Sequence, residues 1–331
     1  MEPGSNQPPH LFFIVGVPRS GTTLLRELLA QHADIALPLD ELQLISPLMD
    51  DFGEDWDFSR PINIEKFIRT VRSSNAAFRA KEKQLEIDYA AFANELSRAS
   101  DWTEVIRVLI TMFLEPGTDR SPLYLGEKTP NNLTRITRFH QTLPGCKFIH
   151  IVRDPRDVCL SMVKAWGKSP YRAAVRWSRY LKSYARDVAD PDIESRCHVL
   201  RYEDLVSDPE PVLRAVCEFL QLPFESAMLS LRRGAEAWGG AAGSNVIERG
   251  SVGRYTDRLS RSVIELIESI CWDEMQAYGY TPDVAVSRTR ISNLRYHAES
   301  LNDFVGASMA HVRDKGLVRG LMYRVKQFRA R

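Results

Sequence analysis

The 331-residue sequence predicts an α/β fold of three layers, with a central parallel sheet flanked by helices. Two observations carry this prediction. Short apolar runs, such as residues 11–15 and 147–152, alternate along the chain with helical patterns of apolar residues. The run at 147–152 is almost unbroken, which is typical of a parallel strand covered on both faces. Because ligands of such sheets bind at the carboxyl ends of strands, the residues that follow each strand are the candidates for function.

The expected elements follow one another as alternating strands and helices. The strands are the short apolar runs at residues 11–15, 34–37, 123–126, 147–152 and 197–202. The helices are the periodic stretches at 132–142, 171–188, 210–220 and 260–277, with a mixed helical region that ends near residue 113. Pro47, Gly53 and Pro61 favour an irregular segment at 46–63.

Composition and charge exclude several classes of partner. The net charge is +1, so bulk charge gives no indication of nucleic-acid binding. The five cysteines show no metal-binding spacing. No apolar run is long enough to span a membrane, and the polar start of the chain, expected to be a disordered tail at 1–10, has no signal-peptide core. We expect a cytoplasmic protein without a metal site and without a nucleic-acid partner.

The first strand leads into a glycine-bearing turn at residues 16–23 and then into a helical pattern. This geometry directs backbone N–H groups and the positive end of a helix to one place, which suits a phosphate. Gly16 and Gly21 have the spacing of a nucleotide-triphosphate P-loop, but Thr22 stands where that loop has lysine. The basic residue is Arg19, inside the turn. The turn therefore predicts an anion site in a P-loop-like fold; a helix cap without a ligand is the alternative.

A second anion motif follows the strand at 147–152. Arg153 ends that strand, and Ser161 lies on the inner side of the next predicted helix. An arginine at a strand end and a serine on the following helix can bind one phosphate together. The alternative is a structural Arg–Asp network in which Asp154 caps the helix. Two independent anion motifs in one chain are more specific than either motif alone.

Together, the motifs resemble those of sulfotransferases, which use 3′-phosphoadenosine 5′-phosphosulfate (PAPS) as the sulfuryl donor. The pattern P-R-S-G-T-T at 18–23 is similar to the family's 5′-phosphosulfate loop, and R-D-P-R-D-x-x-x-S at 153–161 is similar to its 3′-phosphate motif. The resemblance is closest to the tyrosylprotein and bacterial branches. It covers about residues 11–280, which implies a single sulfotransferase domain in which residues 42–113 form a helical insertion on the acceptor side.

The resemblance also implies which residues bind the donor. Tyr202, in R-Y-E-D-L, would face the adenine, with a core aromatic residue at a strand end as the alternative. Arg249, in a late glycine-bearing segment, would close on the 3′-phosphate, and Arg254 is the second candidate for that role. The complete donor-binding set is Pro18, Arg19, Ser20, Gly21, Thr22, Thr23, Arg153, Ser161, Tyr202, Arg249 and Gly250.

Sulfuryl transfer depends on positioning and electrostatic stabilisation of an in-line displacement, and it needs a base for the acceptor proton. By resemblance to the family's G-[DE]-K-[TD]-P element, Lys128 approaches the transferred group, and Arg19 shares its task. The family's carboxylate base falls on Asp40, with Glu41 beside it, and the sequence leaves open which of the two acts. An N-cap role is the alternative for Asp40. No metal is required.

Three functions compete for these motifs. We favour sulfuryl transfer from PAPS to a hydroxyl or amine of an acceptor, which we expect to be a small molecule. A P-loop-like kinase is disfavoured by the missing lysine and by the 3′-phosphate motif. A non-catalytic nucleotide-binding protein is disfavoured by the presence of Lys128 together with Asp40 and Glu41.

The residues at 281–331 are expected to form a basic helical extension. Its last part is rich in arginine and lysine, and Leu317, Leu321, Val325 and Phe328 share one helical face. We favour docking of this face on the domain or on a second copy in a homodimer. Contact with an anionic membrane surface is the alternative.

Overall fold

The computed structural model describes residues 8–53, 56–115, 117–118, 122–231, 249–284, 287–301 and 303. Most of the expected N-terminal tail lies outside these residues, and His10 already begins the first strand. The basic segment at the end of the chain also lies outside them, so its docking face and a membrane contact stay predictions. Among the described residues, no helix is both long enough and apolar enough to cross a membrane.

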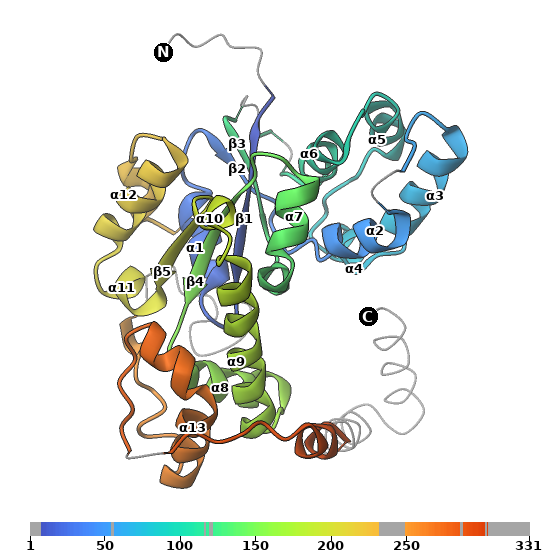
Figure 1. The fold of residues 1–331 in the computed structure, drawn as a ribbon. Coiled ribbons are helices and arrows are strands. Elements are labelled where there is room, and N and C mark those ends of the chain that lie inside the picture. Colours follow the sequence, from blue (N-terminus) through green and yellow to red (C-terminus); the bar gives the residue numbers. More distant parts are fainter. Residues whose placement is uncertain are drawn as a thin grey trace.

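Five parallel strands form the central sheet, in the order β2-β3-β1-β4-β5 (Figure 1). They are β1 (His10–Gly16), β2 (Ile35–Ala36), β3 (Tyr124–Lys128), β4 (Lys147–Val152) and β5 (Cys197–Arg201). β1 lies in the middle, where Ile14 pairs with Lys128 of β3 and with Ile149 of β4. The chain extends the sheet from β1 in both directions, and sheets of this topology bind ligands at the carboxyl ends of their central strands.

Helices cover both faces of this sheet (Figure 1). Before β3 the helices are α1 (Thr22–Leu29), α2 (Ile45–Phe52), α3 (Pro61–Arg72), α4 (Asn75–Glu82), α5 (Tyr89–Leu96) and α6 (Trp102–Met112). After β3 they are η1 (Pro130–Thr134), α7 (Ile136–Thr142), α8 (Pro155–Trp166), α9 (Pro170–Asp187), α10 (Pro191–Glu194), α11 (Tyr202–Ser207), α12 (Pro209–Leu220), η2 (Ser226–Leu229), η3 (Arg249–Ser251) and α13 (Arg261–Ala277).

The central strand divides its side chains between two hydrophobic cores. Phe13 packs in one core with side chains of α6, α7, α9 and α13, whereas Phe12 and Ile14 pack in the other with α1 and α12. Because successive strand side chains point to opposite faces, β1 is buried on both sides. This arrangement confirms the three-layer α/β fold that the sequence predicts.

The insertion between β2 and β3 consists of α2 to α6 and has an aromatic cluster of its own. Phe58 packs edge to face against Phe67 and Trp102. The expectation of an irregular segment at 46–63 is wrong in part, because α2 occupies its first residues. Pro47 is tolerated in the first turn of α2, where a backbone N–H has no intrahelical partner in any case.

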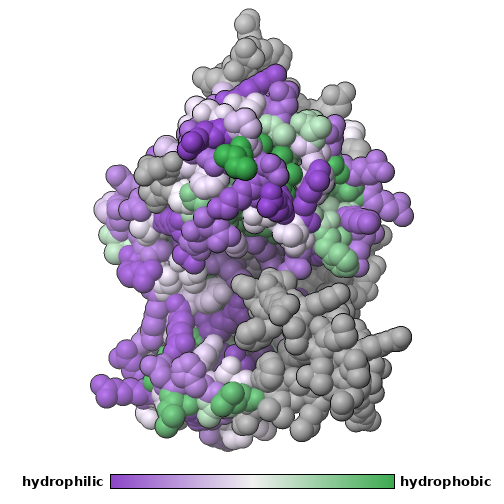
Figure 2. All heavy atoms as spheres, turned by 90° about the vertical axis from the view of Figure 1, so that its right-hand side faces the viewer, coloured by the Kyte–Doolittle hydropathy of each residue, from purple (hydrophilic) through white to green (hydrophobic). Residues whose placement is uncertain are grey.

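The outward face of the insertion is mainly hydrophilic, with a few apolar side chains gathered near its top in this view (Figure 2). Ile62 and Phe78 are the large apolar side chains of the insertion that are exposed among the described residues. Asp50 of α2 forms ion pairs with Arg135 and Arg138 at the start of α7. These ion pairs fasten the insertion to the layer of helices beside the sheet.

Candidate functional site

The turn between β1 and α1 has a backbone shape that its surroundings impose. Gly21 precedes α1 with a left-handed φ of 93°. A Cβ atom at Gly21 would lie 2.3 Å from Cδ2 of Tyr202, so only glycine fits at this position. Arg19 also has a positive φ, of 77°, which is uncommon for a residue with a side chain and is found where function or packing requires it.

Two side chains of this turn have the properties of anion-binding groups. Ser20 is fully buried, and its Oγ has no hydrogen-bond partner among the described residues. A buried hydroxyl without a partner is costly unless water or a ligand completes it. Nε of Arg19 donates to Oγ of Ser161 at 3.0 Å, which joins the turn to α8. Together with the N-terminus of α1, these groups fit an oxyanion.

Arg153 follows β4 and reaches the same turn. Its Nη1 donates to the carbonyl oxygen of Arg19 at 3.2 Å, and its Nη2 donates to that of Ser251 at 2.6 Å. Its Cζ lies 4.2 Å from the ring centroid of Tyr202, and the Tyr202 hydroxyl is hydrogen-bonded to Oγ of Ser251. The structure thus brings Arg19, Arg153, Ser161 and Tyr202 together at the carboxyl ends of β1, β4 and β5. The ring of Tyr202 is buried, and its contact with an adenine stays a prediction.

The late glycine-bearing segment lies over the start of α8. Arg249 begins η3, but its side chain lies outside the described residues, so a contact between Arg249 and a 3′-phosphate stays a prediction. Gly250 follows in the same short helix. The carboxylate of Asp157 accepts hydrogen bonds from the N–H groups of Gly253 at 2.7 Å and Tyr255 at 3.1 Å. Burial raises the pKa of Asp157, and the two N–H groups and nearby Arg153 favour its ionised form.

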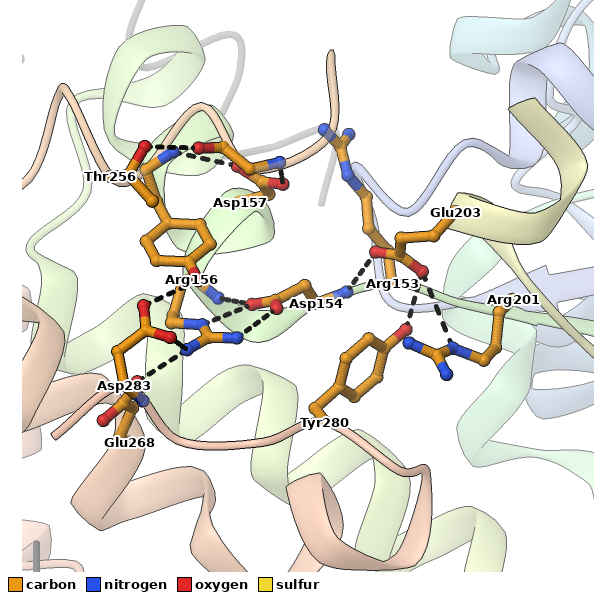
Figure 3. A network of polar contacts seen from close by, with 12 residues as sticks. Arg153, Asp154, Arg156, Asp157, Arg201, Glu203, Thr256, Glu268, Tyr280 and Asp283 are labelled. Carbon is orange, nitrogen blue, oxygen red and sulfur yellow. Dashed lines mark hydrogen bonds and ion pairs between the residues drawn. The ribbon is translucent and has the colours of Figure 1, made fainter. Parts of the chain in front are cut away.

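A largely buried ionic frame lies beside Arg153 (Figure 3). Asp154 caps α8 by accepting from the N–H of Arg156, and the Arg156 guanidinium donates two hydrogen bonds back to the same carboxylate. The guanidinium also bonds to Glu268 of α13 at 2.7 Å and lies 3.1 Å from Asp283. The helix cap that the sequence offers for Asp154 is therefore confirmed, and it occurs within the same motif as Arg153.

Glu203 connects this frame to β5. Its carboxylate accepts from the N–H of Asp154 at 2.9 Å and from the hydroxyl of Tyr280 at 2.9 Å. Burial raises the pKa of Glu203, although the two hydrogen bonds favour the charged form. Arg201 lies 4.0 Å from the same carboxylate (Figure 3). The frame thus links α8, α11 and the segment after α13 around the strand end that presents Arg153.

On the other side of the turn, Lys128 meets Glu41. Lys128 is the last residue of β3 and is buried. Its Nζ lies 2.8 Å from Oε1 of Glu41 and 3.4 Å from Oγ1 of Thr23. Thr23 belongs to the first turn of α1, next to the anion-binding turn. An ammonium group and a carboxylate therefore lie beside the place where the turn would hold an anion.

Asp40 points away from this pair, toward α4. Its Oδ2 lies 3.2 Å from Nε of Arg79 and 3.3 Å from Nζ of Lys83. Partial burial acts to raise the pKa of Asp40, but Lys83, Arg79, the N–H of Glu41 and Lys128 together hold the pKa below its ordinary value. Asp40 does not cap a helix, because α2 begins only at Ile45. The structure therefore separates the two carboxylates between which the sequence leaves a choice.

Residues 9–226 match the model of the sulfotransferase family. The chain belongs to this family. Protein-tyrosine sulfotransferase 1 of Danio rerio is 27% identical to it over 308 residues, which are 90% of this chain and 76% of the relative. The Homo sapiens protein of the same name is 26% identical over 260 residues, 76% of this chain and 60% of the relative. The sulfotransferase domain from the curacin biosynthetic pathway shares the fold, with a TM-score of 0.53 and 21% identity over 84% of this chain and 99% of that domain.

An apolar hollow adjoins Asp40 and Glu41 of this sulfotransferase. The insertion forms one wall of the hollow, and the segment after β2 forms the other. Its apolar lining consists of Pro38, Leu39, Leu42, Ala76, Ala80, Leu85 and Phe113. The insertion therefore borders the carboxylate side of the site, and its expected role in binding the acceptor stays a prediction.

Sequence reasoning missed Glu127, Arg156 and Glu203, which hold the site together without belonging to the expected ligand contacts. Each of them stands in a quoted motif, directly after or near a residue assigned to a ligand. An ionisable residue at or just after an apolar strand run is the signal that could have identified Glu127 and Glu203, since such a group needs a partner when buried. Arg156 lies inside α8 and carries no such signal. In the described part of the chain, no group of three or more His, Cys, Asp or Glu residues could hold a metal ion.

Proposed function

We propose that this sulfotransferase moves a sulfuryl group from PAPS to an acceptor hydroxyl, with Glu41 as the base. The observation that carries the proposal is the contact of Glu41 with Lys128, 2.8 Å, beside Thr23 of the anion-binding turn. A carboxylate can take the proton of a hydroxyl, and an ammonium group beside it can stabilise negative charge on the transferred group. Asp40 is the weaker candidate, because it is paired with Arg79 and Lys83 on the side of α4.

The residues of the donor side fit a ligand with two separate anionic groups. The Oγ of buried Ser20, which has no hydrogen-bond partner among the described residues, and the start of α1 suit the 5′-phosphosulfate. Arg153 and Ser161, which lie beyond Arg19 on the side of β4 and α8, suit the 3′-phosphate. When bound, PAPS supplies the sulfuryl group. The protein residues bind and orient it, and Arg19 adds a fixed positive charge between the two anionic positions.

The acceptor that we propose to test first is the hydroxyl of a protein tyrosine. The names of the curated relatives from Danio rerio and Homo sapiens support this choice. The chain spans only 60% of the Homo sapiens relative, so the comparison leaves part of that protein without a counterpart. The small-molecule acceptor expected from the sequence stays a second prediction, and a phenol is its simplest representative because it presents the same reacting group.

A ligand-binding experiment tests the donor side. Adenosine 3′,5′-bisphosphate should raise the melting temperature of the protein more than AMP does, because AMP lacks the group that Arg153 and Ser161 would bind. ATP with Mg²⁺ tests the competing kinase hypothesis in the same assay. Equal shifts with the bisphosphate and AMP would contradict the assignment of the 3′-phosphate contacts, and a larger shift with ATP would favour the kinase.

A turnover experiment tests the base. Transfer of labelled sulfuryl from PAPS to tyrosyl peptides and small phenols should fall strongly, by about 100-fold or more, in Glu41→Gln. The matched variant Asp40→Asn should stay much closer to wild type, because Asp40 faces Arg79 and Lys83. The reverse order of the two variants would move the base to Asp40. A wild-type protein that binds the bisphosphate but sulfates no acceptor in the panel would reject the proposed activity.

A further inference from the structure

We propose that Glu127 is a positioning residue that fixes Glu41 against Lys128, an inference that rests on the proposed sulfuryl transfer. Glu127 directly precedes Lys128 in β3. Successive side chains of a strand point to opposite faces, so the two residues cannot face the same groups. Lys128 faces Glu41, whereas Glu127 is fully buried and binds the backbone that follows Glu41.

The carboxylate of Glu127 accepts three hydrogen bonds. Its Oε1 accepts from the N–H of Leu42 at 3.1 Å and from the hydroxyl of Thr129 at 2.5 Å, and its Oε2 accepts from the amide of Asn132 at 3.3 Å. A carboxylate without water around it depends on such donors, because an unpaired buried charge is very costly. The N–H of Leu42 is therefore held at the end of β3, one residue after Glu41.

Thr129 fixes the next backbone N–H along the chain, that of Gln43. Its Oγ1 accepts from the N–H of Gln43 at 3.1 Å, while its own hydrogen is donated to Glu127. Gln43 has a left-handed φ of 52°, which a residue with a side chain adopts only when the surroundings require it. In this conformation the side-chain amide of Gln43 donates to Oε2 of Glu41. Two successive backbone N–H groups are thus fixed, and the carboxylate of Glu41 is directed at Lys128.

The contacts of Glu127 distinguish positioning from chemistry. Glu127 bonds to the loop and to neighbouring polar side chains, and it has no exposed surface on which an acceptor could bind. Its loss should let the loop at 41–43 shift and separate Glu41 from the reacting group, while the donor side built around Arg153 keeps its shape. Because a displacement near 1 Å at a reacting group can cost about 100-fold in rate, the effect should appear in kcat.

The experiment compares Glu127→Leu, Glu127→Gln and Thr129→Val with the wild type. Glutamine keeps an acceptor oxygen for Leu42 and Thr129, and the Asn132 amide can flip to meet its NH₂ group. Thr134→Val is the matched control, since the Thr134 hydroxyl donates to the carbonyl oxygen of Asn131 at an exposed position of η1. The acceptor is the tyrosyl peptide or phenol that the wild type sulfates fastest, and the affinity for adenosine 3′,5′-bisphosphate is measured on the same samples.

We expect kcat to fall by about 100-fold in Glu127→Leu and by about 10-fold in Thr129→Val, with bisphosphate affinity within about twofold of wild type. Glu127→Gln and the control should keep most of the activity. Wild-type kcat in folded Glu127→Leu or Thr129→Val would overturn the proposal, and so would an equal loss of bisphosphate affinity. If Glu127→Leu does not fold, Thr129→Val decides. An inactive wild type that still binds the bisphosphate would instead reject the proposed activity.

Discussion

The proposed donor side, around Arg153, and the proposed acceptor side, around Asp40, hold their charges in different environments. On the donor side, Arg156 is 4% exposed and is paired with Glu268, which is completely buried. On the acceptor side, the side chain of Asp40 is 36% exposed, and its partners Arg79 and Lys83 are also open to water. Water compensates an exposed charge that loses its partner, whereas a buried charge has no such replacement. We therefore expect the ion pairs of the donor side to be rigid before a ligand binds and the exposed ion pairs around Asp40 to adjust.

The largest effect is expected when the ionic frame beside Arg153 loses Arg156. Arg156→Met should lower the free energy of unfolding by about 3–5 kcal/mol, because it leaves the buried Glu268 carboxylate without its cation. Arg69→Met is the matched control, since Arg69 is 72% exposed and forms an ion pair with Glu65 within one helix. Arg69→Met should lower the free energy of unfolding by less than about 1 kcal/mol. Urea unfolding of both variants checks the comparison, and similar losses would show that burial does not separate the two kinds of pair.

The next prediction tests whether burial raises the pKa of Glu127, on the acceptor side, as it does for the buried acids of the donor side. Burial raises the pKa of Glu127 from 4.5 to about 7. Between these values the folded protein keeps a proton that the unfolded chain has lost, so the free energy of unfolding falls as pH rises through this window. Glu127 should contribute a loss of about 2–3 kcal/mol between pH 5 and pH 8.

Glu127→Gln cannot titrate and provides the control for this pH dependence. The free energy of unfolding is measured in urea at pH 5 and pH 8 for the wild type and the variant. Between these pH values it should fall by about 2–3 kcal/mol more in the wild type than in Glu127→Gln. Parallel pH dependence in the two proteins would show that the carboxyl of Glu127 titrates in its ordinary range despite its burial.

The smallest expected effect concerns the exposed ion pairs around Asp40. Lys83→Ala should lower the free energy of unfolding by less than about 1 kcal/mol and should leave sulfuryl transfer near the wild-type rate. The pKa of Asp40 should rise, because Lys83 is one of the three cations, with Arg79 and Lys128, that oppose the effect of burial. Denaturation and turnover measurements check the first two statements, and an NMR titration of the Asp40 carboxyl group checks the third. A loss as large as that of Arg156→Met would place the region around Asp40 among the rigid parts of the molecule.

The sequence predicts the sheet and the strand-end residues well, because both depend on local signals. Arg153 directly follows an apolar run and Lys128 lies two residues after one, and parallel strands bring such residues to one edge. The family resemblance is confirmed by the match of residues 9–226. The main error in the fold, the irregular segment at 46–63, arose because a proline in a first helical turn looks like a helix breaker when the start of the helix is unknown.

The orientation of the carboxylates could not be predicted from local signals. Whether Asp40 or Glu41 faces Lys128 depends on Arg79, which comes from the insertion, and on Glu127, which comes from β3. These partners are distant in sequence and carry no pattern that connects them. The same holds for the donor side, where Arg156 meets Glu268 only because α13 packs against α8. Such pairings become visible only when the packing of the helices is known.

The contact between Gly21 and Tyr202 has a consequence for the evolution of this chain. A side chain at position 21 would collide with the aromatic ring at 202, so neither position can change freely while the other stays as it is. We expect the two positions to covary among homologous chains, with a smaller residue at 202 wherever 21 is not glycine. The guanidinium of Arg153 packs on the ring of Tyr202. A substitution at 21 that displaced this ring would therefore also disturb the second anion motif. Two motifs that look independent in the sequence would then be inherited as a unit.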